Sequence, residues 1–261
     1  MKRTLIKNSS LQLPERVMDF ISEADIYDSS SSPEARVYFI DKGPGYYLKA
    51  AAAGALEKEA VMTEFFNKKG LSPAVIEYIR SDRDFLLTER ALGEDCTHQL
   101  YLSDPKRLCI LLAERLRELH EMDFSDCPVQ DRVGEYLSLA EKNYRTGCYD
   151  SSAFPNSFGY ASAEEAYSAL QRGRSELKNE VLIHGDYCLP NIMLDGWKFS
   201  SFIDLGNGGV GDRHIDIFWG VWTLWYNFGT DKYTDLFFDS YGREKINTKK
   251  LKTIAAAEVF G

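Results

Sequence analysis

The sequence predicts an α+β protein with two lobes, a small strand-rich N-terminal lobe at 1–90 and a larger, mostly helical C-terminal lobe at 91–261. Two observations predict this division. Short runs rich in β-branched and aromatic residues, separated by turn residues, dominate the first ninety positions. Beyond Gly93, apolar residues instead recur at the three- and four-residue intervals of a helix. The second lobe is expected to carry a helical insert at about 125–178.

The N-terminal lobe is expected to contain a hairpin, one helix and two further strands. The hairpin joins the runs ARVYFI and YYLKA through the turn Gly-Pro-Gly at 43–45. A helix is expected over 56–69, because Gly70 is suited to end it. The runs VIEYI and DFLLTE are predicted as strands.

The C-terminal lobe is expected to begin with a long helix. Asp104-Pro105 is a helix start, with proline at the first helical position. One buried face of this helix is predicted from the leucines at 108, 112, 116 and 119. The apolar run at 217–228 is too short to span a bilayer and is interpreted as a buried helix. The basic run at 245–252 is interpreted as a solvated helix face.

Composition narrows the class of protein. With 261 residues, 44% hydrophobic and 27% charged, the chain has the composition of a soluble globular protein. A net charge of −9 argues against a nucleic-acid partner. The five cysteines are odd in number and show no C-x-x-C spacing, so reduced thiols in the cytoplasm are expected, without a zinc site. No signal peptide and no membrane segment are predicted.

Three polar side chains carry the chemistry that the sequence predicts. The stretch HGDYCLPN, at 184–191, has the spacing H-x-D-x-x-x-x-N of a kinase catalytic loop, and Asp204 follows in FIDLG. Asp186 would accept the proton of an attacking hydroxyl. Asn191 and Asp204 would supply the oxygen ligands that Mg²⁺ prefers. These groups are expected to converge from loops at strand ends.

The N-terminal lobe should add a strand-borne lysine, and Lys49 in YYLKA fits. Because strand side chains alternate, Tyr47 points to the same side, where it could stack on a purine. Glu59 lies on an apolar helix stripe and is favoured over Glu57 as the ion-pair partner of Lys49. A phosphate-covering loop is expected at 29–34, with Ser30 among its ligands, although no G-x-G-x-x-G is present.

These residues resemble the aminoglycoside phosphotransferases, most of all the 3′-phosphotransferase branch. The resemblance spans nearly the whole chain and is carried by SPEARVY, YYLK, LLTERALG, LLAERLRELH, DFSDCP, HGDYCLPNIMLD, FIDLG, GDRHIDI and AEVF. It implies a protein-kinase-like fold with ATP in the cleft between two lobes. It also implies that the backbones of Glu89 and Ala91 face the adenine. Asp216 would brace the catalytic loop, with a plain helix N-cap as the alternative.

The acceptor side departs from the family pattern, in which carboxylates bind a polycationic drug. Helix positions that are expected to be charged are occupied by Trp222, Tyr226 and Asn227. Of the terminal acids only Glu258 remains, and Asp150 is the carboxylate nearest to the insert. An aromatic pocket would favour flat or apolar surfaces over a polycation, because the charge-assisted hydrogen bonds are lost.

The function expected is therefore ATP- and Mg²⁺-dependent O-phosphoryl transfer to a small molecule, with an aminoglycoside 3′-hydroxyl as the favoured acceptor. Two alternatives stay open. One is the same reaction on a less cationic hydroxylated antibiotic or metabolite. The other is a nucleotide-binding module without turnover. A monomer or weak dimer is expected.

Overall fold

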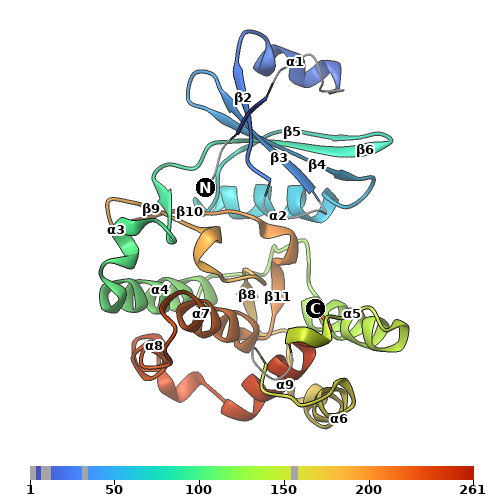
Figure 1. The fold of residues 1–261 in the computed structure, drawn as a ribbon, viewed down its shortest axis with the longest axis vertical. Helices are drawn as coiled ribbons and strands as arrows, with labels where there is room; N and C mark the ends of the chain where they lie inside the picture. Colours follow the sequence, from blue (N-terminus) through green and yellow to red (C-terminus); the bar gives the residue numbers. More distant parts are fainter. Residues whose placement is uncertain (1–3, 7–12, 31–34, 154–157) are drawn as a thin grey trace. The chain divides into compact units, whose positions relative to one another are not determined.

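The computed structural model describes residues 4–6, 13–30, 35–153 and 158–261 (Figure 1). The chain divides into two compact units. The first unit is Met1–Cys96 with Pro190–Gly206, and the second is Thr97–Leu189 with Asn207–Gly261. The assignment of 190–206 to the first unit was not expected from the sequence. The lobe limits 1–90 and 91–261 stay a prediction.

A six-stranded antiparallel sheet forms most of the first unit, in the order β1-β2-β3-β4-β6-β5. The strands are β1 (Thr4–Ile6), β2 (Asp25–Asp28), β3 (Ala35–Asp41), β4 (Tyr46–Ala52), β5 (Val75–Arg80) and β6 (Arg83–Glu89). The predicted hairpin is present as β3 and β4, with Val37 opposite Lys49. The two further predicted strands are β5 and β6.

The two faces of this sheet pack against different helices (Figure 1). Helix α1 (Glu15–Ile21) contributes to an apolar cluster with Leu48 and Ala50 of β4. Helix α2 (Glu57–Lys68) belongs to a second cluster with Ala51. Because side chains alternate along a strand, Lys49 lies on the α2 side of β4. The expectation of a single helix in this part was wrong, since α1 is a second one.

A smaller sheet of the first unit joins residues that are distant in the sequence. Its order is β10-β9-β7, with bounds β7 (Glu94–Asp95), β9 (Ile192–Asp195) and β10 (Lys198–Phe202). Glu94 lies opposite Leu194, and Ile192 lies opposite Phe202. These pairings attach the segment that carries Asn191 to the N-terminal residues.

The described part of the second unit is mainly helical. Its helices are α3 (Gln99–Leu102), α4 (Pro105–His120), α5 (Arg132–Thr146), α6 (Ala163–Gly173), α7 (Arg213–Phe228), α8 (Thr234–Tyr241) and α9 (Thr248–Glu258). Helix α4 begins as predicted, because the Asp104 carboxylate accepts a hydrogen bond from the Arg107 N–H. The four predicted leucines of α4 are all buried. Two short strands, β8 (Val181–Ile183) and β11 (Gly209–Gly211), form an antiparallel pair.

Helix α7 lies beside α4 and α9 (Figure 1). Its buried residues lie along one side of the helix. Ile217, Gly220 and Leu224 are buried. Trp225 and Tyr226 are 37% and 66% exposed, so the interpretation of 217–228 as a buried helix was wrong for its C-terminal turn. The C-terminal turn of α7 therefore presents two aromatic side chains to solvent.

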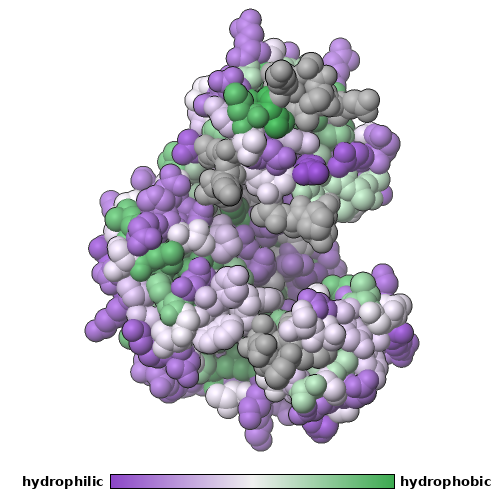
Figure 2. All heavy atoms as spheres, viewed as in Figure 1, coloured by the Kyte–Doolittle hydropathy of each residue, from purple (hydrophilic) through white to green (hydrophobic). Residues whose placement is uncertain are grey.

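The surface of the described residues carries scattered apolar side chains. Figure 2 shows hydrophilic and hydrophobic residues interspersed on the visible face. The large apolar side chains that are exposed include Leu5, Met18, Val61, Leu92, Leu100 and Leu139. Among the described residues, every helix is too short or too polar to span a bilayer.

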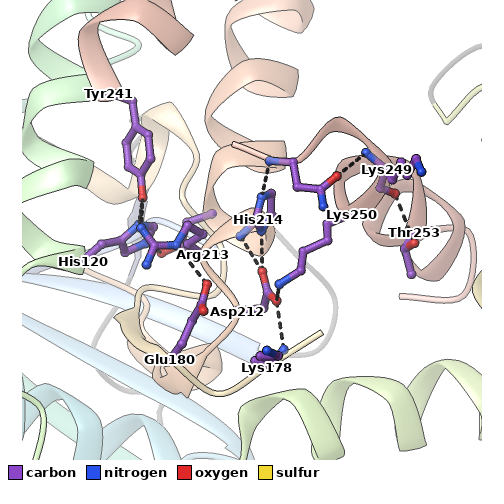
Figure 3. Close-up of polar contacts among 12 residues, drawn as sticks. His120, Lys178, Glu180, Asp212, Arg213, His214, Tyr241, Lys249, Lys250 and Thr253 are labelled. Carbon is purple, nitrogen blue, oxygen red and sulfur yellow. Dashed lines mark hydrogen bonds and ion pairs between the residues drawn. The ribbon is translucent and has the colours of Figure 1, made fainter. Parts of the chain in front are cut away.

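The basic run at 245–252 is not a fully solvated face. The side chain of Lys250 is 12% exposed, and its Nζ lies 2.8 Å from the buried Asp212 carboxylate. The same carboxylate accepts hydrogen bonds from the Lys178 N–H and from His214 (Figure 3). The interpretation was therefore wrong for Lys250, which joins α9 to the start of α7, whereas the neighbouring Lys249 is exposed.

Candidate active site

Lys49 of the first unit is held between two carboxylates. Its Nζ lies 2.7 Å from Glu59 Oε2 and 2.8 Å from Asp204 Oδ1. The first contact follows from the fold, because Lys49 points to the α2 side of the sheet and Glu59 lies on the buried side of α2. Glu57, the alternative partner, pairs with Arg80 instead. The predicted ion pair between Lys49 and Glu59 is therefore present.

The two carboxylates stabilise the charged form of Lys49. Burial by itself would lower the pKa of Lys49, but the carboxylates of Glu59 and Asp204 outweigh burial and raise the pKa. Burial raises the pKa of Glu59, and the Lys49 ammonium offsets part of this effect. Lys49 therefore stays protonated, and an ammonium group of this kind can bind an anion.

Asn191 and Asp204 lie at the same end of the β9–β10 hairpin. Asn191 directly precedes β9 and Asp204 follows β10, while Ile192 and Phe202 are paired. The Ile203 N–H also donates to the Asn191 carbonyl oxygen at 3.0 Å. Asp204 has a φ of +60°, a conformation that non-glycine residues adopt mainly at turns and functional sites. The hairpin thus brings the backbone of Asn191 close to that of Asp204.

The residues predicted to face the nucleotide base lie around β4 and the end of β6. Tyr47 is on the same side of β4 as Lys49, and its ring lies 5.3 Å from that of Phe39. Glu89 ends β6, and its N–H donates to the Ala74 carbonyl oxygen at 3.0 Å. Ala91 follows two residues later and is buried.

Ser30 lies in the connection between β2 and β3. Its hydroxyl oxygen accepts a hydrogen bond from the Val37 N–H at 2.9 Å, and its own N–H donates to Asp28 Oδ1 at 2.9 Å. The hydroxyl and the N–H of Ser30 therefore stabilise the connection between β2 and β3. The rest of the predicted phosphate-covering loop, at 31–34, lies outside the described residues.

Asp186 of the second unit belongs to a loop that is held by a buried carboxylate. Asp216 Oδ2 accepts a hydrogen bond from the His184 N–H at 2.7 Å, and Oδ1 accepts one from the Gly185 N–H at 2.7 Å. Asp216 is fully buried. The bracing contact expected from Asp216 is present, and the N-cap of α7 is Asp212 instead.

His120 and Tyr241 extend this brace and were missed from the sequence. His120 Nε2 lies 3.2 Å from Asp216 Oδ2. Its Nδ1 lies 2.8 Å from the Tyr241 hydroxyl oxygen (Figure 3). Burial lowers the pKa of His120, so the ring is neutral at physiological pH. Because Asp216 can only accept, Nε2 donates to it and Nδ1 accepts from Tyr241. The available signal was a histidine one turn beyond Leu116 on the buried leucine face.

Glu258, one of the predicted acceptor-binding residues, accepts hydrogen bonds from side chains of two other helices. Its Oε1 accepts hydrogen bonds from the Tyr136 hydroxyl at 2.8 Å and from the Trp219 Nε1–H at 3.0 Å. Burial raises the pKa of Glu258 to about 7, although these two hydrogen bonds act in the opposite direction. Tyr136 and Trp219 were also missed, because they lie 122 and 39 positions from Glu258.

The other predicted acceptor residues differ in their surroundings. Trp222 and Tyr226 stack, with ring centroids 5.0 Å apart and planes at 15°. The side-chain amide of Asn227 donates to the Thr223 carbonyl oxygen of its own helix at 2.8 Å. The exposed Asp150 accepts a hydrogen bond from the Ser152 N–H at 2.8 Å and stabilises a local turn. Only Trp222 and Tyr226 are brought together.

Comparison with known proteins places the chain in a family. The model of the phosphotransferase enzyme family matches residues 30–252. The chain belongs to this family. A probable aminoglycoside 3′-phosphotransferase of Lactococcus lactis is 51% identical to this phosphotransferase over 251 residues, covering 96% of this chain and 95% of that protein. An aminoglycoside 3′-phosphotransferase of Niallia circulans is 33% identical over 177 residues, covering 68% of this chain and 67% of that protein.

Solved structures give the same fold. The crystal structure of a type VIII aminoglycoside 3′-phosphotransferase matches with a TM-score of 0.80 at 22% identity, covering 95% of this chain and all of that chain. An aminoglycoside phosphotransferase of Streptomyces rimosus, solved with ADP and streptomycin, matches with a TM-score of 0.74 at 22% identity, covering 86% and 90% of the two chains. The predicted α+β, protein-kinase-like fold is therefore confirmed.

Proposed function

We propose that this phosphotransferase transfers the γ-phosphoryl group of ATP to a hydroxyl of a small molecule, and that its acceptor is an aminoglycoside 3′-hydroxyl. The observation that carries the proposal is the Lys49 ammonium, held at 2.7 and 2.8 Å between Glu59 and Asp204. An ammonium group fixed on a strand by a helix carboxylate is the phosphate-binding arrangement of kinases. The 51% identity to a probable aminoglycoside 3′-phosphotransferase supports the acceptor.

In the first unit, Lys49 would bind the α- and β-phosphates and Glu59 would hold Lys49 in place. Tyr47 would stack on the adenine, and the backbones of Glu89 and Ala91 would form its hydrogen-bonding edge. Ser30 would contribute from the β2–β3 connection. The position of Tyr47 on the Lys49 side of β4 supports this division of roles.

The donor set at the end of the β9–β10 hairpin fits Mg²⁺. Asn191 and Asp204 offer only oxygen, which is the ligand that this hard cation prefers, and one carboxylate with phosphate oxygens is its usual set. When bound, Mg²⁺ would neutralise charge on the transferred phosphoryl group. Asp204 also binds Lys49, so the carboxylate links the metal position to the phosphate-binding ammonium.

Asp186 would act as the catalytic base. Its carboxylate would accept the proton of the acceptor hydroxyl while the hydroxyl oxygen attacks the γ-phosphorus and ADP leaves. No covalent intermediate with the protein is needed, because positioning and charge neutralisation lower the barrier. Asp216 would keep the loop in register through the backbone N–H groups of His184 and Gly185.

For the acceptor we propose contacts with Glu258, Trp222, Tyr226, Asn227 and Asp150. A less cationic hydroxylated antibiotic or metabolite is the second candidate. It is favoured by the stacked, partly exposed pair Trp222 and Tyr226, which offers a ring surface rather than a carboxylate. We further propose a cytoplasmic monomer or weak dimer without a nucleic-acid partner, in line with the net charge of −9.

A coupled assay of ADP release with kanamycin and neomycin tests the proposal. A 3′-deoxy aminoglycoside is the matched control, because it retains the amino groups and lacks only the reacting hydroxyl. We expect turnover with the first two compounds and none with the third. Asp186→Asn should abolish turnover, and Asn191→Ala should raise the Mg²⁺ concentration needed for half-maximal rate. Phosphorylation of neutral sugars in preference to aminoglycosides would favour the second candidate instead.

A further inference from the structure

Among the described residues, only one of the two carboxylate oxygens of Glu258 accepts hydrogen bonds. Oε1 accepts from the Tyr136 hydroxyl and the Trp219 Nε1–H. Within the described part of the chain, no hydrogen bond to Oε2 is formed, and this oxygen is turned toward Gly261, where a Cβ atom would lie 2.9 Å away. Two neutral donors therefore fix the carboxylate without cancelling its charge.

Trp219 also belongs to a continuous row of aromatic rings on α7. Its ring centroid lies 5.2 Å from that of Trp222, which stacks on Tyr226 at 5.0 Å. Positions 219, 222 and 226 are spaced by three and four residues, so they share one helix face. Tyr226 is 66% exposed, so the row runs from a held carboxylate to an accessible ring surface.

This face of α7 also contacts the loop that carries Asp186. Thr223, four residues after Trp219, accepts a hydrogen bond from the Leu189 N–H at 3.2 Å. The negative charge of Asp186 contributes to the raised pKa of Glu258. Among the described residues, the groups that interact with Glu258 are Tyr136 from α5, Trp219 from α7, and Asp186 and Cys188 from the proposed catalytic loop.

We propose that Trp219 and Tyr136 set the acceptor specificity by holding Glu258 so that its free oxygen binds one ammonium group of an aminoglycoside. The sugar ring that carries this group then lies on Trp222 and Tyr226, where the ring faces also attract a cation. This inference rests on the proposed function and adds two specificity-determining residues to it. The preferred acceptor presents one ammonium group and one ring face to this surface, rather than several ammonium groups to several acids.

The protonation of Glu258 sets the pH range of this recognition. Only the carboxylate attracts an ammonium group, so the KM for the acceptor should fall as pH rises through about 7. Loss of either hydrogen bond removes an interaction that favours the carboxylate, so the midpoint should move to higher pH. A purely structural role of Trp219 would not move this midpoint.

The test compares Trp219→Phe and Tyr136→Phe with wild type, with Tyr160→Phe as the control. Tyr160 also donates one hydroxyl hydrogen bond, to the Lys252 carbonyl oxygen at 2.7 Å, away from Glu258. We expect the acceptor KM at pH 7 to rise about tenfold in both test variants, because a hydrogen bond to a charged group is worth that much. The kcat and the KM for ATP should stay within about twofold. An unchanged acceptor KM, or equal changes in both KM values, would overturn the inference.

A second measurement does not depend on turnover or on the folding of Trp219→Phe. The carboxyl carbon of Glu258 can be titrated by NMR in the wild-type protein, with and without kanamycin and without nucleotide. Binding of an ammonium group to Oε2 should lower the midpoint of about 7. If kanamycin is phosphorylated and the midpoint does not move, the inference fails while the proposed function stands. If the midpoint falls without turnover, Glu258 binds the ammonium group but the proposed function fails.

Discussion

Lys49 Nζ lies 2.7 Å from Glu59 Oε2 and 2.8 Å from Asp204 Oδ1, so one ammonium group joins β4, α2 and the end of the β9–β10 hairpin. The lysine side chain is 20% exposed and that of Glu59 is 11% exposed. A charge in such surroundings requires its partner, because an unpaired buried ion is costly. The first unit therefore holds this ammonium group in a fixed position, in line with the phosphate-binding role proposed for Lys49.

Replacing the ammonium group should impair nucleotide use and also lower the stability of the fold, because the nearly buried Glu59 carboxylate loses its cation. We expect Lys49→Met to lower kcat/KM for ATP by roughly 10²- to 10³-fold, the size of effect seen when a preorganised electrostatic group is lost. Lys68→Met, at an exposed position of the same α2, is the control. Steady-state kinetics with varied ATP measure the effect. A Lys49→Met enzyme with unchanged kcat/KM would contradict the assigned role.

The brace on the catalytic loop predicts a combined loss of rate and stability. Asp216→Asn puts an amide where two backbone N–H groups now meet a carboxylate, and an unsatisfied buried donor costs about 1–3 kcal/mol. We expect kcat to fall at least about tenfold while the KM for ATP changes little. Kinetics below the melting temperature and a thermal melt measure both effects.

Asp123→Asn is the matched control for this substitution, because its carboxylate also accepts a backbone N–H, from Ser125 at 3.1 Å, but lies exposed. A fall in melting temperature with unchanged kcat would show that Asp216 is structural only. Retained kcat in Asp123→Asn is expected in either case.

The local features of the fold followed from the sequence. The hairpin β3–β4, the start of α4 at Asp104 and the pairing of Lys49 with Glu59 all depend on residues close in sequence or on the alternation of one strand. Periodicity and turn chemistry carry this information. The catalytic spacing at 184–191 is local in the same sense.

The long-range features did not follow from the sequence. The pairing of Glu94–Asp95 with β9 joins residues about a hundred positions apart, and a two-residue strand has no pattern of its own. The partners of Glu258 and Lys250 come from other helices for the same reason. Such contacts are decided by packing, which a single sequence does not reveal.

The buried pair of Lys250 and Asp212 predicts a specific loss of stability. Lys250→Met leaves a fully buried carboxylate without its cation, which costs on the order of 3 kcal/mol. For a chain of this size we expect the melting temperature to fall by roughly 6–12 °C. Lys249→Met, at the next and exposed position, should leave it unchanged, and equal melting temperatures for the two variants would contradict the prediction.

The Asp212 carboxylate should also contribute to the loss of folding stability at low pH. Burial would raise the pKa of Asp212, but hydrogen bonds from His214 and Lys250 outweigh burial and lower it. A folded-state pKa below the unfolded value of about 3.9 gives stability that is present above that pH and is lost as pH falls further. Denaturation of Asp212→Asn should therefore show a weaker pH dependence below about pH 4 than wild type. An unchanged acid limb would show that other carboxylates dominate.

Gly185 allows the catalytic loop to approach the chain at Asn207. Its φ is +83°, and a Cβ atom would lie 2.0 Å from the Asn207 carbonyl oxygen. Gly147 also has a positive φ, of +67°, but a Cβ there would meet no atom within 4 Å. Alanine at either position carries the left-handed strain of about 1–2 kcal/mol, so the pair separates strain from collision.

We expect Gly185→Ala to displace the loop and lower kcat by roughly 10²-fold or more, because small misplacements of a catalytic group are costly. Gly147→Ala should lose a similar amount of stability from strain and keep its kcat. Equilibrium unfolding and initial-rate kinetics on both variants measure the difference. Equal kcat values would show that the loop tolerates the collision, and that Asp186 does not depend on the close approach of Gly185 to Asn207.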